Sequence, residues 1–448
     1  MKIGEVYELN IDDISHDGWG VGRSNNMVVF VRGALPLDTV RTSITFCKKT
    51  YAKGRLVSVV KPSPHRILSD CDYFESCGGC TLRNFAYEAE ISCKEKRVHK
   101  ALSKIAHTED YVSYDCMPCD NVCNYRNKAE YGLCIRDNEV VMGFMAEKSD
   151  EIVDVHDCKL MMAGINSTAS EIRDILAGYK EYIGESGLHH VIIRQSNYNK
   201  EIMVIFVSGR NDYNWAVEVS KELSKRLEMV KSVHHVMSPA RFGWNFLGAT
   251  TLIFGKDRIT EKIGHVLIDI SPVSFLQVNT TQAAKLYDRA KELLNLSNTE
   301  FVLDMYCGTG SIGLTMADSV RKVLGIEAVE LAVLDAKHNA KLNNISNAEF
   351  VSDLAEDAVN DIFEDAETPD VVVLDPPRVG CDAVVLKQIA YLKVGRIAYI
   401  SCNPETLARD IAILIALGYV LQMVQPVDMF PRTMHVETIA LLQYASIS

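Results

Sequence analysis

The sequence lacks an apolar run long enough to cross a membrane, and it contains no internal repeat or low-complexity tract. Its longest uncharged apolar stretch, residues 411–421, is far shorter than the roughly 18–20 residues that a transmembrane helix needs. The first residues, MKIGEVYELNIDD, carry acids where a signal peptide has its apolar core. We therefore expect a cytoplasmic protein without a membrane partner.

Positive charge is also scarce, because 47 lysines and arginines face 59 acidic residues, for a net charge of −12. This balance argues against nucleic-acid binding through a global field, so any RNA partner must be held by local basic patches. The 13 cysteines are an odd number in a chain without an export signal, so clustered thiols indicate a metal or catalysis before disulfides. A hydrophobic content of 48% excludes a disordered chain, and 448 residues predict two or three domains.

Residues 1–60 contain four short extended runs separated by turn residues, which predicts a small β-barrel. Basic side chains gather here around an aromatic one: Lys48, Lys49, Lys53 and Arg55 lie close to Tyr51. Such a surface is either an RNA-binding strand face or a solvated hairpin.

Residues 61–270 combine a cysteine-rich start with α/β segments, including a predicted strand pair at 191–195 and 202–207 and a helix over 215–227. From residue 271 onward, strands and helices alternate, which predicts a mainly parallel sheet. Asn279 caps the first predicted helix of this part. The predicted strands are 301–305, 323–326, 371–374 and 396–400, followed by an antiparallel pair at 419–424 and 435–442.

The loop D-M-Y-C-G-T-G at residues 304–310 follows the first of these strands and precedes a helix. Its glycines allow a close backbone approach to a ligand, and Glu327 ends the next strand, where an acid can accept both hydroxyls of a ribose. A dinucleotide site has the same plan, so NAD is an alternative. Asp304 discriminates, because it would repel a pyrophosphate but suits a cationic sulfonium. The loop resembles the first motif of class I S-adenosylmethionine methyltransferases.

Two further strands end in chemically active residues, Asp375 in L-D-P-P-R and Cys402 in S-C-N-P. Strand ends of such sheets face the ligand crevice, so both side chains should face the methyl donor. A thiolate that adds to C6 of a uracil makes C5 nucleophilic, and a base must then remove the C5 proton. Glu437, in M-H-V-E-T, is the candidate base. The alternatives are a packed thiol and a surface acid.

Together these motifs, with F-L-Q-V-N at 275–279, resemble the RNA 5-methyluridine (uracil-C5) methyltransferase family in its order along the chain. The resemblance implies an α/β fold with a class I, Rossmann-like catalytic domain over residues 271–448 and an N-terminal OB-like TRAM barrel. It also implies that Cys402 is the nucleophile and Glu437 the base. The implied contacts to S-adenosylmethionine are Gln277, Tyr306, Glu327 and Asp375, with Asp353 as a weaker candidate.

Cys71, Cys77 and Cys80 form a compact C-x5-C-G-G-C pattern whose spacing fits either zinc or an iron–sulfur cluster, with a fourth ligand from elsewhere. The pattern resembles that of the cluster-bearing branch of the same family. This resemblance implies a [4Fe–4S] cluster in the central domain, with Cys158 as the fourth ligand.

A second cysteine group, Cys116, Cys119 and Cys123, runs straight into Y-R-N-K, and we expect it to bind no metal. Arg126 and Lys128 in that segment are candidates for contacts with RNA phosphates, or for a structural ion pair. Further upstream, a basic run reads as extra basic surface or as a solvated helix face: Lys94, Lys96, Arg97 and Lys100.

The resemblance to a TRAM module, with the cysteine pattern, points to the branch that acts on 23S rRNA, while a tRNA substrate stays open. A cytosine-5 methyltransferase is disfavoured, since those enzymes carry a cysteine where this chain has Pro377. A non-catalytic iron–sulfur RNA-binding protein and a small-molecule methyltransferase are the alternatives from other classes. We expect a monomer.

Overall fold

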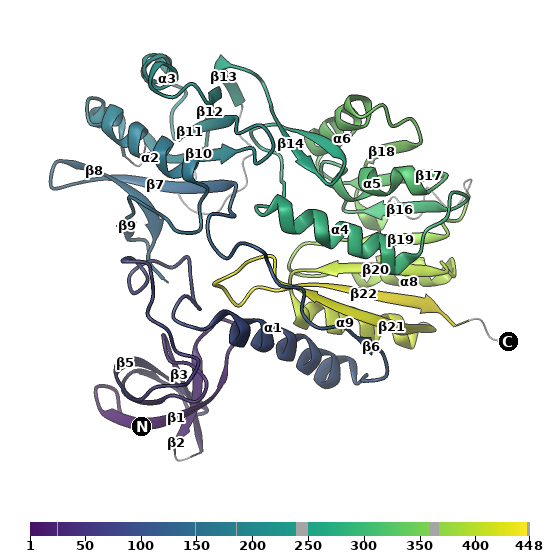
Figure 1. Cartoon of the computed structure of the whole chain (residues 1–448), viewed down its shortest axis with the longest axis horizontal. Coiled ribbons are helices and arrows are strands. Elements are labelled where there is room, and N and C mark those ends of the chain that lie inside the picture. The colour runs from purple at the N-terminus through teal and green to yellow at the C-terminus, as the bar shows by residue number, and fades with distance from the viewer. Residues whose placement is uncertain (25, 148, 185, 239–249, 358–366, 446–448) are drawn as a thin grey trace.

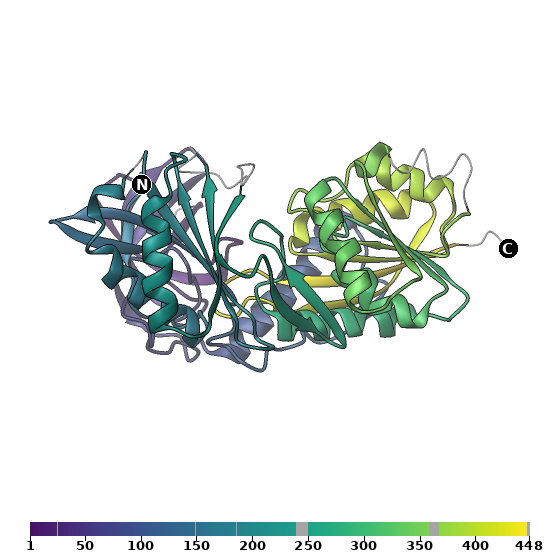
Figure 2. The ribbon, with the colours of Figure 1, turned by 90° about the horizontal axis from the view of Figure 1, so that it is seen from above.

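The computed structural model describes every residue except 25, 148, 185, 239–249, 358–366 and 446–448. The described chain folds into a small barrel, a seven-stranded sheet and an eight-stranded sheet, each sheet with its own helices (Figures 1 and 2). Within these residues, no helix combines the length and the apolar character that a membrane crossing requires.

Five strands close the N-terminal barrel in the order β1-β2-β3-β5-β4, which confirms the predicted barrel. Alternating side chains such as Leu9, Ile11, Val29 and Val31 fill its interior. Gly20 is needed at the closure, because a Cβ there would lie 2.6 Å from the carbonyl oxygen of Ala34. The strands are β1 (Val6–Ile14), β2 (Gly20–Ser24), β3 (Met27–Val31), β4 (Thr39–Cys47) and β5 (Tyr51–Lys61).

The central sheet has the strand order β13-β12-β11-β10-β7-β8-β9. The predicted strand pair and helix are confirmed here, since β10 pairs antiparallel with β11 and a helix covers residues 214–226. Its elements are β7 (Lys128–Arg136), β8 (Glu139–Met145), β9 (Ile152–Asp154), α2 (Ala163–Leu176), β10 (Leu188–Gln195), β11 (Ile202–Ser208), α3 (Asn214–Arg226), β12 (Val230–Met237) and β13 (Thr250–Gly255). A hairpin of β14 (Ile259–Ile263) and β15 (Val266–Ile270) leads to the second sheet.

The C-terminal sheet has the order β18-β17-β16-β19-β20-β22-β21-β6, and its first five strands are parallel, as predicted. Strand β22 runs antiparallel to both β20 and β21, which confirms the predicted final pair. Asn279 caps α4 by accepting a hydrogen bond from the amide of Gln282. The strands are β16 (Phe301–Met305), β17 (Lys322–Glu327), β18 (Ala348–Ser352), β19 (Val371–Leu374), β20 (Arg396–Ser401), β21 (Tyr419–Val427) and β22 (Glu437–Tyr444). The helices are α4 (Thr280–Leu294), α5 (Ser311–Met316), α6 (Glu330–Leu342), α8 (Ala383–Tyr391) and α9 (Pro404–Ala416).

Helix α1 (Tyr87–Ala101) leaves the barrel and packs on the C-terminal sheet, as Figure 1 shows. Its apolar side chains Val98 and Ala101 share a core with strands β20 to β22, and the short strand β6 (Val112–Ser113) pairs with β21. Residues 87–113 therefore pack on the C-terminal side, while the limits 1–60, 61–270 and 271–448 stay predictions for the domains.

Lys94 of α1 is fully buried, so the expected surface role of this lysine is wrong. Its ammonium lies 2.7 Å from Glu90 Oε1 and 2.6 Å from Asp428 Oδ1, and it donates to the carbonyl of Phe430. This ion triad fastens α1 to the loop that leads into β22.

We expect the substitution Lys94→Met to lower the free energy of unfolding by about 3–5 kcal/mol, because it removes the cation that two buried carboxylates share and leaves Glu90 only the more distant Arg432, at 3.6 Å. The measurement is the denaturant midpoint of the purified variant. Lys96→Met, on the exposed side of the same helix, is the matched control and should change stability by less than about 0.5 kcal/mol. Equal midpoints for the two variants would show that the triad contributes little.

Candidate functional site

The predicted site residues lie side by side along one edge of the C-terminal sheet. The register pairs Met305 with Ile326 and with Leu374, and Glu327 with Ser352, so the parallel strands end at the same level. Carboxyl ends of parallel strands form the ligand crevice of such sheets. From edge to centre, the residues at these ends are Asp353, Glu327, Tyr306, Asp375 and Cys402.

Glu437 joins this row because β22 runs antiparallel to β20. Ser401 on β20 pairs with Thr438 on β22. Because the two strands are antiparallel, Cys402, the residue after Ser401, lies beside Glu437, the residue before Thr438. Glu437 is only 2% exposed, and its Oε2 has no hydrogen-bond partner among the described residues. A thiol and a buried carboxyl group therefore lie side by side at the same edge of the sheet.

The loop that carries Cys402 is tied to the loop that carries Asp375. The side chain of Asn403 donates to the carbonyl oxygen of Arg378 at 3.0 Å and caps α9 by accepting from the amide of Glu405. Cys402 thus sits immediately before the N-terminus of a 13-residue helix, whose dipole favours the thiolate form.

The glycine-rich loop after β16 has the shape of a ligand cradle. Gly308 and Gly310 have positive φ angles of 54° and 79°, and a Cβ on Gly310 would lie 2.9 Å from the Phe350 ring. Asp304 accepts from the amide of Gly313 through Oδ2, while its buried Oδ1 has no hydrogen-bond partner among the residues that the structure describes. Glu327 accepts from the amide of Gly308 at 3.1 Å. The loop backbone is therefore flanked by carboxylates from the ends of β16 and β17.

Burial raises the pKa of three acids at this edge, namely Asp304, Asp375 and Glu437. The pKa of Asp304 is raised to about 7 by burial and by Asp375 and Glu327. Burial also raises the pKa of Asp375 and, together with the charge of Asp375, that of Glu437. An acidic, desolvated crevice of this kind favours a cationic ligand over a pyrophosphate. The electrostatics therefore favour a sulfonium cofactor over NAD.

The thiol of Cys402 has a pKa raised to about 11 by burial and by Glu437, against the lowering effect of Arg378. Arg378 was not among the predicted site residues, although it stands in the motif that supplied Asp375. Its guanidinium lies 3.5 Å from His435, whose pKa is lowered to about 4 by burial and by nearby cations. His435 is therefore neutral at pH 7. Tyr287 was also missed, because its α4 position indicates only a core residue; Asp375 and Glu437 contribute to its raised pKa.

Gln277 lies in the loop before α4, which is held by the Y-R-N-K segment. The side chain of Asn127 donates to the carbonyl oxygen of Gln277 at 3.0 Å. The backbone amide of Asn127 donates to the carbonyl oxygen of Val278 at 2.8 Å. Gln277 is buried, and its predicted cofactor contact stays a prediction.

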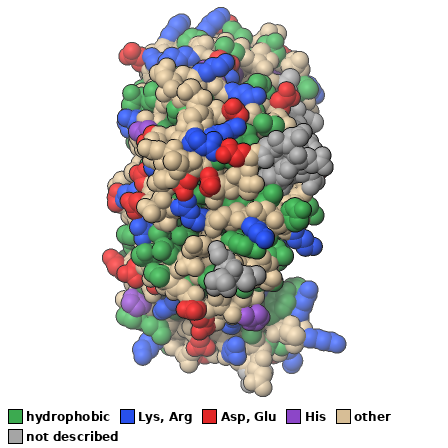
Figure 3. All heavy atoms as spheres, turned by 90° about the vertical axis from the view of Figure 1, so that its right-hand side faces the viewer, with side chains coloured by type: hydrophobic (Ala, Val, Ile, Leu, Met, Phe, Trp, Pro, Cys, Tyr) green, Lys and Arg blue, Asp and Glu red, His purple; other side chains and the backbone are tan. Residues whose placement is uncertain are grey.

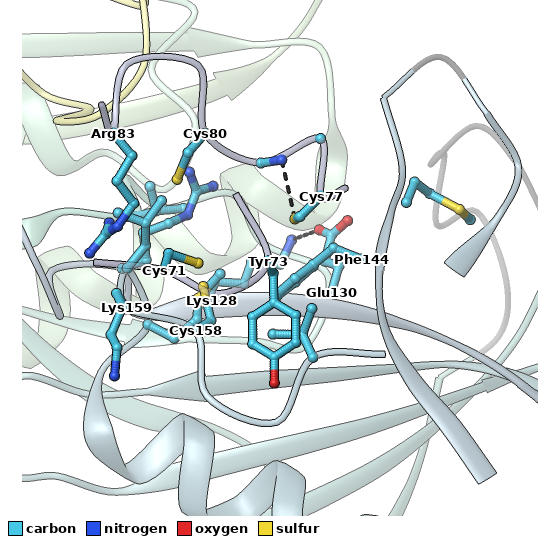
Figure 4. A pocket seen from close by; sticks show the side chains of 18 of the residues that line it. Cys71, Tyr73, Cys77, Cys80, Arg83, Lys128, Glu130, Phe144, Cys158 and Lys159 are labelled. Carbon is cyan, nitrogen blue, oxygen red and sulfur yellow. Dashed lines mark hydrogen bonds and ion pairs between the residues drawn. The ribbon is translucent and has the colours of Figure 1, made fainter. Parts of the chain in front are cut away.

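The four predicted cluster ligands, Cys71, Cys77, Cys80 and Cys158, line one cavity of about 750 Å³. Figure 4 shows these thiols around the same space, three from one loop and Cys158 from another. Burial and the other three thiols together raise the pKa of Cys80 to about 12, against the lowering effect of Arg83. Across the described residues, no three His, Cys, Asp or Glu side chains converge closely enough to hold a single metal ion.

The second cysteine group lies apart in three environments. Cys116 is buried, Cys119 accepts from the side chain of Asn279, and Cys123 accepts from Arg83. That this group binds no metal stays a prediction.

Arg126 and Lys128, the expected phosphate contacts, also line the large cavity. Lys128 forms an ion pair with Glu130 at 2.5 Å, which matches the structural alternative for this residue. Arg126 keeps a buried Nε without a partner in the described structure.

The chain matches two family models: "tRNA (Uracil-5-)-methyltransferase" over residues 86–445 and "TRAM domain" over residues 1–57. It is 34% identical over 444 residues to a Halalkalibacterium halodurans protein described as an uncharacterized RNA methyltransferase, covering 98% of this chain and 97% of the relative. A Caldanaerobacter subterraneus protein of the same description is 36% identical over 448 residues, with 99% of both chains covered. The crystal structure of Pyrococcus abyssi tRNA (uracil-54, C5)-methyltransferase with S-adenosyl-L-homocysteine is similar with a TM-score of 0.76 and 25% identity. That match covers 97% of this chain and 100% of the other.

Proposed function

The chain belongs to the tRNA (uracil-5-)-methyltransferase family, and we propose that it methylates C5 of a uridine in 23S rRNA through a covalent adduct with Cys402. The observation that carries this proposal is the register between β20 and β22, which sets Cys402 beside Glu437 at the acidic edge of the sheet. S-adenosylmethionine supplies the electrophilic methyl group when bound.

The proposed chemistry uses the two side chains in sequence. The thiolate of Cys402 adds to C6 of the uracil, and the electron pair of the C5–C6 double bond moves to C5 and the C4 carbonyl as an enolate. C5 then takes the methyl group. Glu437 removes the remaining C5 proton, the C5–C6 double bond forms again, and the C6–S bond breaks to release the thiolate. The positive charge of Arg378 acts to lower the pKa of both Cys402 and Glu437, and so favours the thiolate and the carboxylate.

The cofactor fits the glycine-rich loop and the row of strand ends. We propose that Glu327 accepts the ribose hydroxyls, and that the carboxylate of Asp375 faces the sulfonium side of the molecule. The orphaned Oδ1 of the buried Asp304 and the positive-φ glycines support a ligand at this place. Gln277, Tyr306 and Asp353 complete the proposed set.

We further propose that Cys71, Cys77, Cys80 and Cys158 hold a [4Fe–4S] cluster. The chemistry of four thiols around one cavity suits this group. Arg83 and Arg126 on the cavity wall would balance the negative charge of the thiolates.

Protein purified without oxygen should be brown and contain about four irons per chain, as this cluster type requires. Cys158→Ala should lose most of the iron, whereas Cys134→Ala, a partly buried thiol on β7, should keep it. Iron and zinc analysis together with the visible spectrum gives the answer. A colourless protein with one zinc, or full iron retention in Cys158→Ala, would contradict the proposal.

The choice of 23S rRNA rests on the TRAM barrel together with the cysteine quartet. A tRNA substrate is the second candidate, because the similarity to the P. abyssi tRNA enzyme covers almost the whole chain. We propose that the enzyme acts in the cytoplasm as a monomer.

Incubation of unmodified 23S rRNA and tRNA transcripts with methyl-labelled S-adenosylmethionine tests the function. We expect labelled 5-methyluridine in the rRNA, located by nucleoside analysis of protected fragments. Label in tRNA alone would reassign the substrate. RNA binding without any labelled nucleoside would indicate a non-catalytic RNA-binding protein instead.

A further inference from the structure

A groove of about 420 Å³ lies between the N-terminal barrel and helix α1. The barrel contributes residues 13–16, Val21 and Phe30, and the helix contributes its basic side. Glu405 and Met434 complete the lining. Nothing in the proposed catalytic or cluster chemistry uses this groove.

The helix side of the groove is a lysine stripe, which we define as Lys96, Lys100 and Lys104. All three are exposed; Lys96 and Lys100 lie four residues apart on one face of α1, and Lys104 lies on the π-helical turn Leu102–Ala106 that continues the helix. Lys100 forms an ion pair with Asp13 of the barrel at 2.5 Å. Neither Lys96 nor Lys104 forms an ion pair or hydrogen bond with another described residue. Like charges at this spacing repel each other, so an anionic ligand would stabilise them.

The location of the stripe matters because the chain as a whole is acidic. Among the described residues on the face in Figure 3, basic and acidic side chains are interspersed rather than gathered. The lysine stripe is a local concentration of one charge beside a groove, which is the form of basic surface that an acidic protein needs to hold RNA.

One end of the groove reaches the catalytic loops. Glu405, in the first turn of α9, stands three residues after Cys402, and Met434 stands three residues before Glu437. Arg97 of α1 connects these two segments. Its guanidinium pairs with Glu405 at 2.7 Å and donates to the carbonyl oxygen of Met434 at 2.9 Å. A chain lying in the groove would therefore run toward the nucleophile and the base.

On its barrel side, the groove reaches a row of aromatic rings. The ring of Phe30 lies 6.0 Å from that of Tyr51, which lies 5.9 Å from that of Phe46. The ammonium of Lys48 lies 5.8 Å from the Phe46 ring and 5.9 Å from the Tyr51 ring. Rings next to cations are the usual platform for unpaired bases.

We propose that this groove binds a single-stranded segment of the substrate RNA that flanks the target uridine. Its phosphates lie along the lysine stripe, and its bases reach the row formed by Phe30, Tyr51 and Phe46. Lys96 and Lys100, four α-helical residues apart, are separated by about 6 Å along the helix axis, which suits one phosphate per lysine along an extended strand. The inference rests on the proposed function and extends it by naming the path of the RNA.

The test compares two double variants of the full-length protein in binding an unstructured polyuridine oligonucleotide by fluorescence anisotropy. Lys96→Gln with Lys104→Gln should weaken binding about tenfold and lower the slope of log K against log salt by about 1.4, because two phosphate contacts are lost. Lys221→Gln with Lys225→Gln on α3 changes the net charge equally, far from the groove, and should leave binding unchanged. The arginine pair Lys96→Arg with Lys104→Arg should keep wild-type affinity.

Equal effects of the two glutamine pairs, or an unchanged salt slope, would overturn the proposal. A perfect RNA duplex bound as tightly as the single strand, with the same dependence on the stripe, would overturn its single-strand part. Because this assay measures binding without methyl transfer, its failure is distinct from failure of the labelled-methyl experiment, which tests the proposed function alone.

Discussion

Cys402→Ala should abolish methyl transfer to RNA, with a loss of at least about 10⁴-fold in rate, since it removes the nucleophile rather than tuning it. Without the thiol no C6 adduct forms, C5 stays a poor nucleophile, and no methyl group moves. The measurement is single-turnover transfer of labelled methyl into RNA. A denaturing gel with 5-fluorouridine RNA provides a second readout, because fluorine cannot leave as a proton does and should trap the wild-type enzyme covalently.

Two controls separate this loss from misfolding. Cys134→Ala removes a thiol from β7, outside the crevice, and should retain full turnover and the trapped species. Cys402→Ala itself should still bind RNA with wild-type affinity, because the thiol is only one atom of the crevice. A Cys402→Ala enzyme that still cross-links to 5-fluorouridine RNA would exclude this residue as the nucleophile.

Glu437→Gln should accumulate a covalent protein–RNA species that carries the transferred methyl group. The thiol can still add and C5 can still take the methyl group, but the C5 proton has no base, so the C6–S bond cannot break. A base contributes about 10²–10⁴ in rate, so steady turnover should fall by that factor while the adduct becomes visible on denaturing gels. Normal turnover in this variant would assign the proton to another base.

The same carboxyl group should give the wild-type enzyme a pH dependence. Burial and the charge of Asp375 raise the pKa of Glu437 to about 8. Only the ionised carboxylate accepts the proton, so release of the adduct should accelerate as pH rises from 7 through about 8 and then level off. In Glu437→Gln this dependence should disappear, because the amide does not ionise. Rapid quenching of the methylated adduct at a series of pH values measures both profiles.

The sequence alone determined the elements whose signals are local. Alternating strands and helices predicted the parallel sheet, and its first five strands are parallel. Asn279 as a helix cap and the glycine loop after β16 were readable because caps and turns depend on neighbouring residues. The motifs at strand ends could be placed on one edge because parallel strands all end on the same side.

Only the tertiary structure decided which distant side chains meet. Glu437 reached Cys402 through an antiparallel register that no local pattern encodes, and Cys158 came to the cavity of Cys71, Cys77 and Cys80 from a separate loop. Lys94 also could not be placed from the sequence. It stands in a run of basic residues that indicated a surface, yet it is buried between two carboxylates. Local sequence fixes backbone conformation, whereas burial and charge pairing depend on packing between segments far apart in the chain. The burial of Lys94 and the position of the lysine stripe beside a groove therefore become visible only in the folded protein, whereas the motif had already named Glu437 as the candidate base.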